Sequence, residues 1–261
     1  MKYSPGMNTN IRKSALVTGA AKRLGRAIAI GLAKDGWDIA VHYRSSEPEA
    51  LETVDQIKGL GRTAIAISCD LSSETETRQL LPRAMTQLGD IRCIVNSASL
   101  FTYDDAHSFN QAALDAHMHS NLAAPILLAQ ALHAATPEGA QSVVINLLDQ
   151  KLFNLNPDFL SYTLSKSGLH TATKLLAMSL APKLRVVGLA PGLTLVSGDQ
   201  TDQQFEKAHQ QTVLGKSSTA DDIAQAVCYL ANADGITGTT LIVDGGQHLT
   251  PMQRDVMFLA K

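Results

Sequence analysis

The chain has 261 residues, with 22 Lys and Arg against 24 Asp and Glu, and 45% of its residues are hydrophobic. The formal net charge of −2 provides no basic surface of the kind that nucleic acids or anionic membranes require, so we expect neither as a partner. Only 18% of the residues are charged, which excludes a mainly disordered chain and indicates a globular protein with a large core.

The cysteines and the N-terminus bear on the compartment. Three cysteines without a CxxC pair argue against a disulfide framework or a zinc site, and the eight histidines show no metal-ligand spacing, so we expect no metal. The first residues contain no apolar stretch of signal-peptide type, and no segment has the ~18 apolar residues of a membrane helix. We therefore expect a cytoplasmic protein with a short disordered leader over residues 1–10.

Short β-branched runs alternate with segments of helical periodicity along the chain. The expected strands are Ala15–Thr18, Asp38–His42, Thr63–Ser68, Ile91–Asn96, Ser142–Leu147, Arg185–Leu189 and Thr240–Val243. The expected helices include Leu24–Lys34, Glu49–Lys58, Glu74–Leu88 (which Pro82 should kink or break) and Leu169–Leu180. This alternation predicts the α/β class: a doubly wound parallel sheet, or Rossmann fold, with three α/β/α layers in a single domain over residues 11–250.

A glycine-containing turn follows the first expected strand. Gly19, Arg23, Leu24 and Gly25 lie in the segment TGAAKRLGR, which leads directly into a helix. Such turns bring backbone amides at a helix N-terminus close to the pyrophosphate of a dinucleotide. A glycine pair alone is weak evidence, but its place in the first strand–helix–strand unit favours nucleotide binding. Arg23 stands where such turns usually have a middle glycine, and its guanidinium can pair with phosphates.

The end of the second expected strand distinguishes NADH from NADPH. It contains His42, Tyr43, Arg44 and Ser45, and the first acidic residue is Glu47. An acidic residue would hold the ribose 2′-hydroxyl of NAD, whereas an arginine accommodates the 2′-phosphate of NADP. The segment predicts NADPH as the cofactor, with a solvated loop arginine as the alternative interpretation.

Tyr162 and Lys166 have the spacing of a catalytic pair. Residues i and i+4 lie on one face of a helix, and a nearby ammonium lowers the pKa of a tyrosine from about 10. Such a tyrosine can pass a proton to a substrate that receives hydride from a nicotinamide. The YxxxK pattern alone is common on protein surfaces, but together with the glycine turn it is specific.

With further landmarks, these motifs resemble the short-chain dehydrogenase/reductase family over nearly the whole chain. The landmarks are Asp70-Leu71, Asn96-Ser97-Ala98-Ser99, Asn121, Pro191-Gly192 and Asp244-Gly245-Gly246. The resemblance implies that Asp70 and Leu71 contact adenine, and that Pro191 and Gly192 border the nicotinamide. It further implies that Asn96, Ser97 and Ala98 bind the cofactor, and that Asn121 is catalytic, supporting a water that leads to Lys166.

Three departures from the common family pattern indicate one branch. Asp149 stands thirteen residues before Tyr162, where most members have a serine; Arg23 replaces glycine; and NSASLF, residues 96–101, replaces NNAG. These changes resemble the pteridine reductase branch, including dihydromonapterin and dihydrofolate reductases. The resemblance implies NADPH-dependent reduction of dihydromonapterin, dihydrobiopterin or dihydrofolate. In that reaction Tyr162 donates a proton with Asp149, and Lys166 lowers the tyrosine pKa and binds the ribose.

The expected substrate-binding residues are Arg23, Ser99, Phe101, Asp149, Tyr162 and Leu193. Phe101 could stack on a flat ring, with core packing as the alternative. The carboxyl of Asp149 could orient the phenol or relay a proton, with a loop cap as the alternative. In the family, the stretch 193–211 is a mobile lid, so it should shape the pocket. Asp104 and Asp105 are interpreted as part of a solvated loop.

Two other functions stay open. The first is a short-chain carbonyl reductase of 3-oxoacyl or other ketone substrates, in which Asp149 merely replaces serine. The second, from another class, is a non-catalytic dinucleotide-binding sensor. The segments Asn110–Ala135 and Tyr162–Leu180 resemble the helix pair through which the family dimerises, so a homo-oligomer, a tetramer, is expected. The apolar tail 251–261 should pack on a neighbouring subunit.

Overall fold

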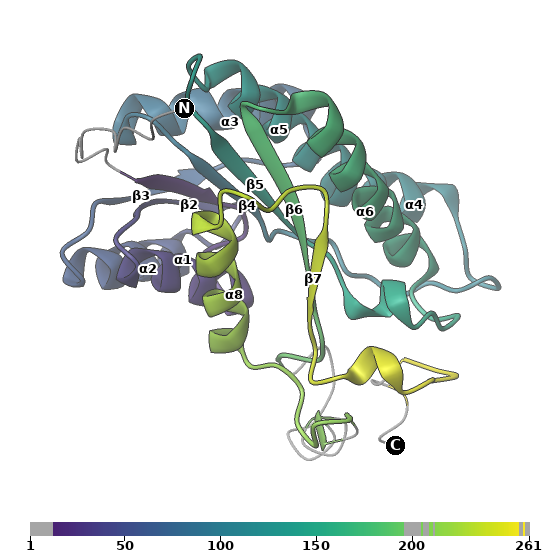
Figure 1. The fold of residues 1–261 in the computed structure, drawn as a ribbon. Coiled ribbons are helices and arrows are strands. Elements are labelled where there is room, and N and C mark those ends of the chain that lie inside the picture. The colour runs from purple at the N-terminus through teal and green to yellow at the C-terminus, as the bar shows by residue number, and fades with distance from the viewer. Residues whose placement is uncertain (1–12, 196–204, 206–208, 211, 256–257, 259–261) are drawn as a thin grey trace, which may run out of the picture.

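The computed structural model describes residues 13–195, 205, 209–210, 212–255 and 258. In this part of the chain seven strands form one sheet in the order β3-β2-β1-β4-β5-β6-β7, and all neighbouring strands are parallel (Figure 1). The strands are β1 Ser14–Val17, β2 Asp38–Tyr43, β3 Ala64–Ser68, β4 Cys93–Asn96, β5 Ser142–Leu147, β6 Leu184–Pro191 and β7 Thr240–Val243. The predicted single-domain, doubly wound parallel sheet is confirmed.

Helices cover both faces of the sheet. One layer holds α1 Arg23–Lys34, α2 Glu47–Gly59 and α8 Ala220–Asn232, and the other holds α3 Glu74–Leu88, α4 Gln111–Met118, α5 Ala124–Ala135 and α6 Leu160–Leu180 (Figure 1). Buried aliphatic side chains such as Ile28 and Val227 fill the first interface, and Leu80 and Leu128 belong to the second. Because both faces are covered, every residue of β1, β4, β5 and β6 is buried.

Two helices differ from the predictions. Pro82 is predicted to kink or break α3, and the helix is not broken there but runs on from Glu74 to Leu88. Its buried Leu80, Leu81 and Ala84 pack on the sheet around the proline, and we attribute its continuity to this packing, which offsets the backbone hydrogen bond that proline removes. The predicted helix Asn110–Ala135 consists of α4, a π-helical turn at His119–Ala123 and α5. Such turns occur frequently at functional sites, and this one contains Asn121.

The sheet topology determines where a ligand can bind. β1 lies between β2 and β4, so the connections leave in opposite directions on its two sides. In open parallel sheets this switch point leaves a crevice at the carboxyl ends of the strands. None of the described helices is long and apolar enough to span a bilayer.

Candidate active site

A cavity of about 620 Å³ lies at this crevice. Its size is that of a small-molecule site. Of the residues predicted from sequence, those that line it are Gly19, Arg23, Leu24, Gly25, His42, Arg44, Asp70, Leu71, Ser97, Ala98, Ser99, Phe101, Asp149, Tyr162, Lys166, Pro191, Gly192 and Leu193. The four that are not among its lining residues are Tyr43, Ser45, Asn96 and Asn121. Most of the predicted site is therefore brought together in one cavity.

The glycine turn is a tight backbone arch between β1 and α1. Gly19 has a φ of +66°, and a Cβ at Gly25 would come within 2.2 Å of the Gly19 carbonyl oxygen. The hydroxyl of Thr18 accepts hydrogen bonds from the amides of Ser97 and Ala98, each 3.0 Å long, which joins the ends of β1 and β4. Only glycine at positions 19 and 25 fits this close approach, because a Cβ would press on Ala98 or on the Gly19 carbonyl.

Arg23 has a left-handed backbone, with a φ of +52°. This conformation is unfavourable for a residue with a Cβ and costs about 1–2 kcal/mol. Arg23 is exposed and lines the cavity at the start of α1. The strain suggests that its guanidinium has a use that offsets the cost.

This strain gives a testable difference between two variants. Arg23→Gly should unfold with a free energy about 1 kcal/mol larger than Arg23→Ala, because only glycine adopts a positive φ without strain. Both variants lose the guanidinium, so its contacts cancel in the comparison, and both should bind a dinucleotide more weakly. Urea unfolding of the two variants measures the difference, and equal stabilities would show that residue 23 is not held in this conformation.

His42 is buried, and both of its ring nitrogens contact backbone atoms of the fold. Its Nδ1 accepts a 3.0 Å hydrogen bond from the Gly19 amide, and its Nε2 lies 3.0 Å from the Cys69 carbonyl oxygen. The ring is 2% exposed, and burial lowers its pKa from 6.5 to about 4. A neutral ring with its proton on Nε2 satisfies both contacts, so His42 ties the glycine turn to β2 and to the end of β3.

We expect His42 to make folding sensitive to acid. The unfolded chain takes up a proton on this histidine near pH 6.5, whereas the folded chain takes it up only near pH 4. Stability is therefore fully present above pH 6.5 and falls by about 3 kcal/mol as the pH drops to 4. The stability difference between wild type and His42→Gln should narrow over this range in denaturant titrations. His107→Gln, at an exposed loop position, is the matched control; a difference from wild type that stays constant for His42→Gln contradicts the assignment.

Two predicted asparagines hold the framework of the site. Asn96 donates a 2.8 Å hydrogen bond to the side chain of Asn146, whose amide in turn donates to Thr173 on α6. Asn121 accepts from the Leu100 amide at 2.7 Å and donates to the Leu100 carbonyl at 2.9 Å. Its amide also donates to the Ser165 hydroxyl on α6 at 3.0 Å. In this structure the Asn121 side chain therefore fixes the loop after β4.

Tyr162, Asp149 and Lys166 form the polar centre of the cavity. The Tyr162 hydroxyl donates a 2.7 Å hydrogen bond to Asp149 Oδ2, and the Lys151 amide donates to Asp149 Oδ1 at 2.8 Å. Lys166 is 3% exposed, and its Nζ donates to the Leu147 carbonyl at 2.7 Å and lies 5.8 Å from the centroid of the tyrosine ring. The i, i+4 spacing on α6 places both side chains at the cavity, as predicted.

The electrostatics of this centre correct one prediction. The pKa of Tyr162 is raised well above 10, because the phenol is buried and the Asp149 carboxylate opposes its ionisation. The predicted lowering of the Tyr162 pKa is therefore wrong, since burial and Asp149 decide the direction of the shift. Burial raises the pKa of Asp149 above its usual value and lowers that of Lys166 to about 8. The Tyr162 phenol therefore keeps its proton, and the Asp149 carboxyl binds a proton more readily than an ordinary aspartate does.

An aromatic wall stands beside this centre. Phe101 stacks on Phe159 with ring centroids 4.3 Å apart, and it meets the edge of Tyr162 at 4.7 Å. Phe101 is 41% exposed and lines the cavity, so its ring is not part of the closed core. Phe159, with a φ of +56°, precedes α6, whose first turn is capped by Asp104 through the amide and hydroxyl of Ser161. Asp104 is buried, so its predicted place in a solvated loop is wrong.

One protein family matches a stretch that contains the glycine turn, the YxxxK pair and the strands β2 to β7. The family described as enoyl-(acyl carrier protein) reductase matches residues 19–248, from the glycine turn to the segment after β7. The chain belongs to the short-chain dehydrogenase/reductase family. It is thus an oxidoreductase.

Members of the family similar to this chain carry different names. An alternative dihydrofolate reductase from Brucella canis, crystallised with NADP, is 37% identical, with a TM-score of 0.88 over 93% of this chain and 96% of its own. The corresponding protein of Brucella suis, also in complex with NADP, is 38% identical, with a TM-score of 0.88 over 93% and 97%. The 3-oxoacyl-acyl-carrier-protein reductase of Staphylococcus epidermidis is 30% identical over 248 residues, 92% of this chain and 100% of its own.

Several lining residues of this short-chain dehydrogenase/reductase were missed by the sequence analysis. They are Lys22, Cys69, Leu100, Ser120, Leu147, Leu148, Gln150, Lys151, Gln247 and Asp255. Most of them adjoin a predicted motif, so neighbourhood in sequence could have found them. Lys151 and Asp255 are brought together only by the fold, and no motif marks them. Within the described residues, no group of three or more His, Cys, Asp or Glu side chains is arranged to hold a metal.

The C-terminal tail packs on its own chain in the described residues. Phe258 lies edge-on to Tyr103, with ring centroids 5.6 Å apart, and Arg254 pairs with Asp158. The expectation that the tail also packs on a neighbouring subunit stays a prediction. Residues 193–195 of the predicted lid line the cavity, but most of the lid, from residue 196 on, lies outside the described residues, as does the leader 1–10.

Proposed function

We propose that this oxidoreductase is an NADPH-dependent pteridine reductase that acts on dihydromonapterin, dihydrobiopterin or dihydrofolate. The observation that carries the proposal is the 2.7 Å hydrogen bond between the Tyr162 hydroxyl and Asp149. Reducing a C=N bond of a pterin requires a proton on the ring nitrogen as well as a hydride on carbon, and this buried pair can hold that proton. Similarity to the two Brucella proteins named as dihydrofolate reductases supports it.

The cavity fits a dinucleotide at the carboxyl ends of the strands. The glycines at 19 and 25 leave room where a Cβ would collide, and Arg44 is exposed where β2 ends. Arg44 would hold the 2′-phosphate and Lys166 the ribose next to the nicotinamide. Asp70 and Leu71 would flank the adenine. When bound, NADPH supplies the hydride.

The chain's own residues would manage the proton. Tyr162 donates its phenolic proton to the ring nitrogen, and the ammonium of Lys166 stabilises the phenolate that this leaves. A protonated Asp149 then returns a proton to the phenolate across the same hydrogen bond. Phe101 offers a flat surface on which a pterin can stack against the nicotinamide, and Arg23, Ser99 and Leu193 border that space.

The direct test is NADPH oxidation with a panel of dihydropterins and a 3-oxoacyl thioester. We expect turnover of at least one dihydropterin, with a larger kcat/KM than for the thioester. Turnover of the thioester alone would overturn the proposal.

A short-chain carbonyl reductase is the second candidate. It is favoured by the 3-oxoacyl reductase relative, which is matched over its whole length. On this reading Asp149 stands in for the serine that holds a substrate carbonyl, and Asp149→Ser would retain or raise ketone reduction. A dinucleotide-binding sensor without catalysis is a third reading, which predicts that the Tyr162 hydroxyl is dispensable.

The NADPH preference gives a further prediction. Arg44→Ala should weaken NADPH binding about 10- to 100-fold and leave NADH binding nearly unchanged, since a hydrogen bond to a charged group contributes about 1.5–3 kcal/mol. Fluorescence titration with both cofactors measures the change. Arg26→Ala, which removes an arginine that pairs with Glu52 outside the cavity, is the matched control. An unchanged preference in Arg44→Ala would remove Arg44 from the cofactor site.

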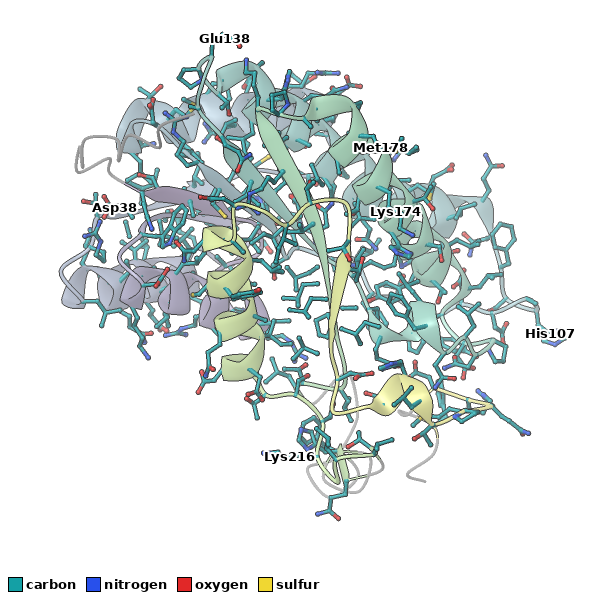
Figure 2. All side chains as sticks on the ribbon, viewed as in Figure 1. Asp38, His107, Glu138, Lys174, Met178 and Lys216 are labelled. Atoms are coloured by element: carbon teal, nitrogen blue, oxygen red, sulfur yellow. The ribbon has the colours of Figure 1, made fainter. Side chains whose placement is uncertain are left out.

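Assembly and location are part of the same proposal. On α6, Leu175 is 60% exposed and Met178 is 80% exposed, and Figure 2 shows Met178 on the outer side of the molecule. We infer that this apolar strip packs on a second copy, as in a homotetramer of the family type. All three cysteines are free, which suits a reducing compartment, so we place the enzyme in the cytoplasm.

A further inference from the structure

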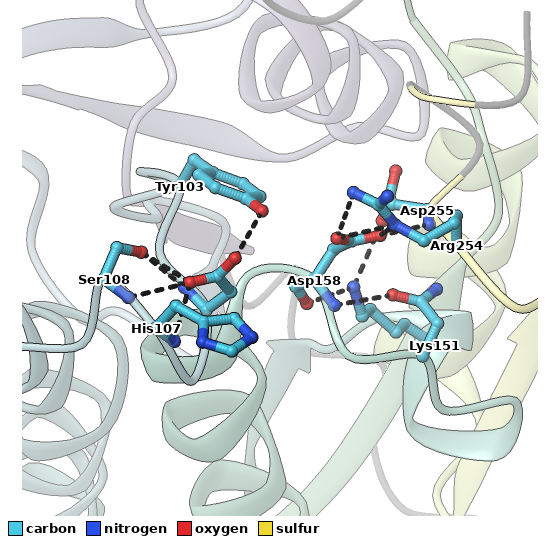
Figure 3. Close-up of polar contacts among 9 residues, drawn as sticks. Tyr103, His107, Ser108, Lys151, Asp158, Arg254 and Asp255 are labelled. Carbon is cyan, nitrogen blue, oxygen red and sulfur yellow. Dashed lines mark hydrogen bonds and ion pairs between the residues drawn. The ribbon is translucent and has the colours of Figure 1, made fainter.

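The C-terminal tail is fastened beside the cavity by a buried carboxylate. Arg254 Nε lies 3.0 Å and 2.9 Å from the two Oδ atoms of Asp158, and the Asp255 amide donates to Asp158 Oδ2 at 2.7 Å (Figure 3). Asp158 is 2% exposed. Because a buried carboxylate with these three bonds loses much when they break, the contact holds residues 254 and 255 in place.

The fastened tail carries a charge to the cavity wall. Asp255 Oδ2 lies 3.2 Å from Lys151 Nζ, which also donates to the Asp158 carbonyl at 2.6 Å (Figure 3). Both Lys151 and Asp255 line the cavity, and Lys151 is 3% exposed. An ion pair formed by the tail and the segment after β5 therefore forms part of the site.

This ion pair adjoins the proton-handling centre. The Lys151 amide donates to Asp149 Oδ1 at 2.8 Å. Burial raises the pKa values of Asp149 and Tyr162, and the negative charge of Asp255 adds to both increases. Tyr162, Lys151 and Asp255 line one cavity, so a substrate ring at Tyr162 whose substituent points toward the tail would place it beside the Asp255 carboxylate.

The charges of Lys151, Asp255 and the adjoining Asp158–Arg254 pair favour one kind of substrate substituent. Asp255 neutralises Lys151, and Asp158 pairs with Arg254. An approaching carboxylate would meet the Asp255 charge and would have to compete with it for Lys151, whereas a hydroxyl could donate to Asp255 and accept from Lys151.

We propose that Asp255, supplied by the C-terminal tail, is a specificity residue that makes the enzyme prefer dihydropterins with a neutral, hydroxylated side chain over those whose side chain ends in carboxylates. The proposal rests on the proposed pterin reduction. It assigns the tail of this chain a place in its own substrate site.

The test compares Asp255→Asn with Arg254→Gln in the full chain. The assay measures kcat/KM with NADPH for dihydrobiopterin, whose side chain is neutral, and for dihydrofolate, whose side chain carries carboxylates. The ratio of dihydrofolate to dihydrobiopterin should rise roughly tenfold in Asp255→Asn, because Lys151 is then free to pair with the substrate. Arg254→Gln loosens the tail without changing the charge at position 255. Because it leaves the Asp158 carboxylate without its cation, the ratio should not rise in this variant.

The outcomes separate this inference from the proposed function. A ratio unchanged in Asp255→Asn, with pterins still reduced, overturns only the role of Asp255. If the ratio rises as much in Arg254→Gln, the position of the tail, and not the Asp255 carboxylate, selects the substrate. Binding of oxidised folate and biopterin to the NADP-loaded protein should show the same shift in Kd. Failure of wild type to bind or reduce any pterin overturns the proposed function and this inference together.

Discussion

Tyr162→Phe should reduce kcat for a dihydropterin by about 10²–10⁴-fold, the contribution typical of a positioned proton donor. The phenol is buried and its pKa is raised by burial and by Asp149, so it carries a transferable proton over the whole working pH range. Phenylalanine keeps the ring that packs against Phe101 but cannot donate. NADPH binding should change little, since Lys166 and the glycine turn remain. Stopped-flow hydride transfer and cofactor titration measure the two effects separately.

The matched control is Tyr229→Phe, which removes the hydroxyl of a 60% exposed tyrosine on α8, outside the cavity. We expect its kcat to equal that of wild type. Wild-type turnover by Tyr162→Phe would instead leave the carboxyl of Asp149 as the donor. If neither the wild type nor the variants turned over any substrate while NADPH still bound, the hypothesis of a non-catalytic dinucleotide-binding sensor would be supported.

Local sequence patterns predicted the fold and most of the site because their physics is local. Alternating apolar runs and helical periods imply a parallel sheet, and the ends of its strands collect at one edge. Tyr162 and Lys166 reach the cavity because helical spacing sets their direction. Arg44 and Asp70 line it because each follows a strand, so a strand's end predicts a residue's place in the crevice.

Other features depend on contacts that a single segment does not contain. Asp104 caps α6 from 57 positions away, and Asp255 meets Lys151 across 104 positions. The sign of the Tyr162 pKa shift depends on how deeply the phenol and Asp149 are buried together, which the spacing of Tyr162 and Lys166 does not reveal. Both ring nitrogens of His42 are used within the fold, and its place in the segment after β2 does not reveal these contacts.

Asp149→Asn should reduce dihydropterin turnover about 100-fold and also change its pH dependence. In wild type, burial raises the pKa of Asp149, so the protonated carboxyl persists above its usual range. Because the acid form is the one that returns the proton, the wild-type rate should fall as the pH rises through this pKa. Asparagine can still accept the Tyr162 hydrogen bond but cannot titrate. The variant should therefore lose the fall in rate that follows the Asp149 pKa. Its remaining fall should come as Lys166 loses its charge, at a pH below the wild-type Lys166 pKa of about 8, because the Asp149 carboxylate that raises this pKa is gone.

Asp149→Ser distinguishes the two catalytic readings at the same position. Serine places a neutral hydroxyl thirteen residues before Tyr162, where it could hold a substrate carbonyl. If the enzyme is a pteridine reductase, both Asp149→Asn and Asp149→Ser lose dihydropterin turnover, because neither side chain can store a proton. If it is a carbonyl reductase, Asp149→Ser reduces 3-oxoacyl thioesters at least as fast as wild type. The wild-type kcat then shows no change with pH that follows the Asp149 pKa. Profiles of kcat from pH 5 to 9 for the three proteins with both substrates decide between these readings, since the charge of Asp149 matters only where it moves a proton.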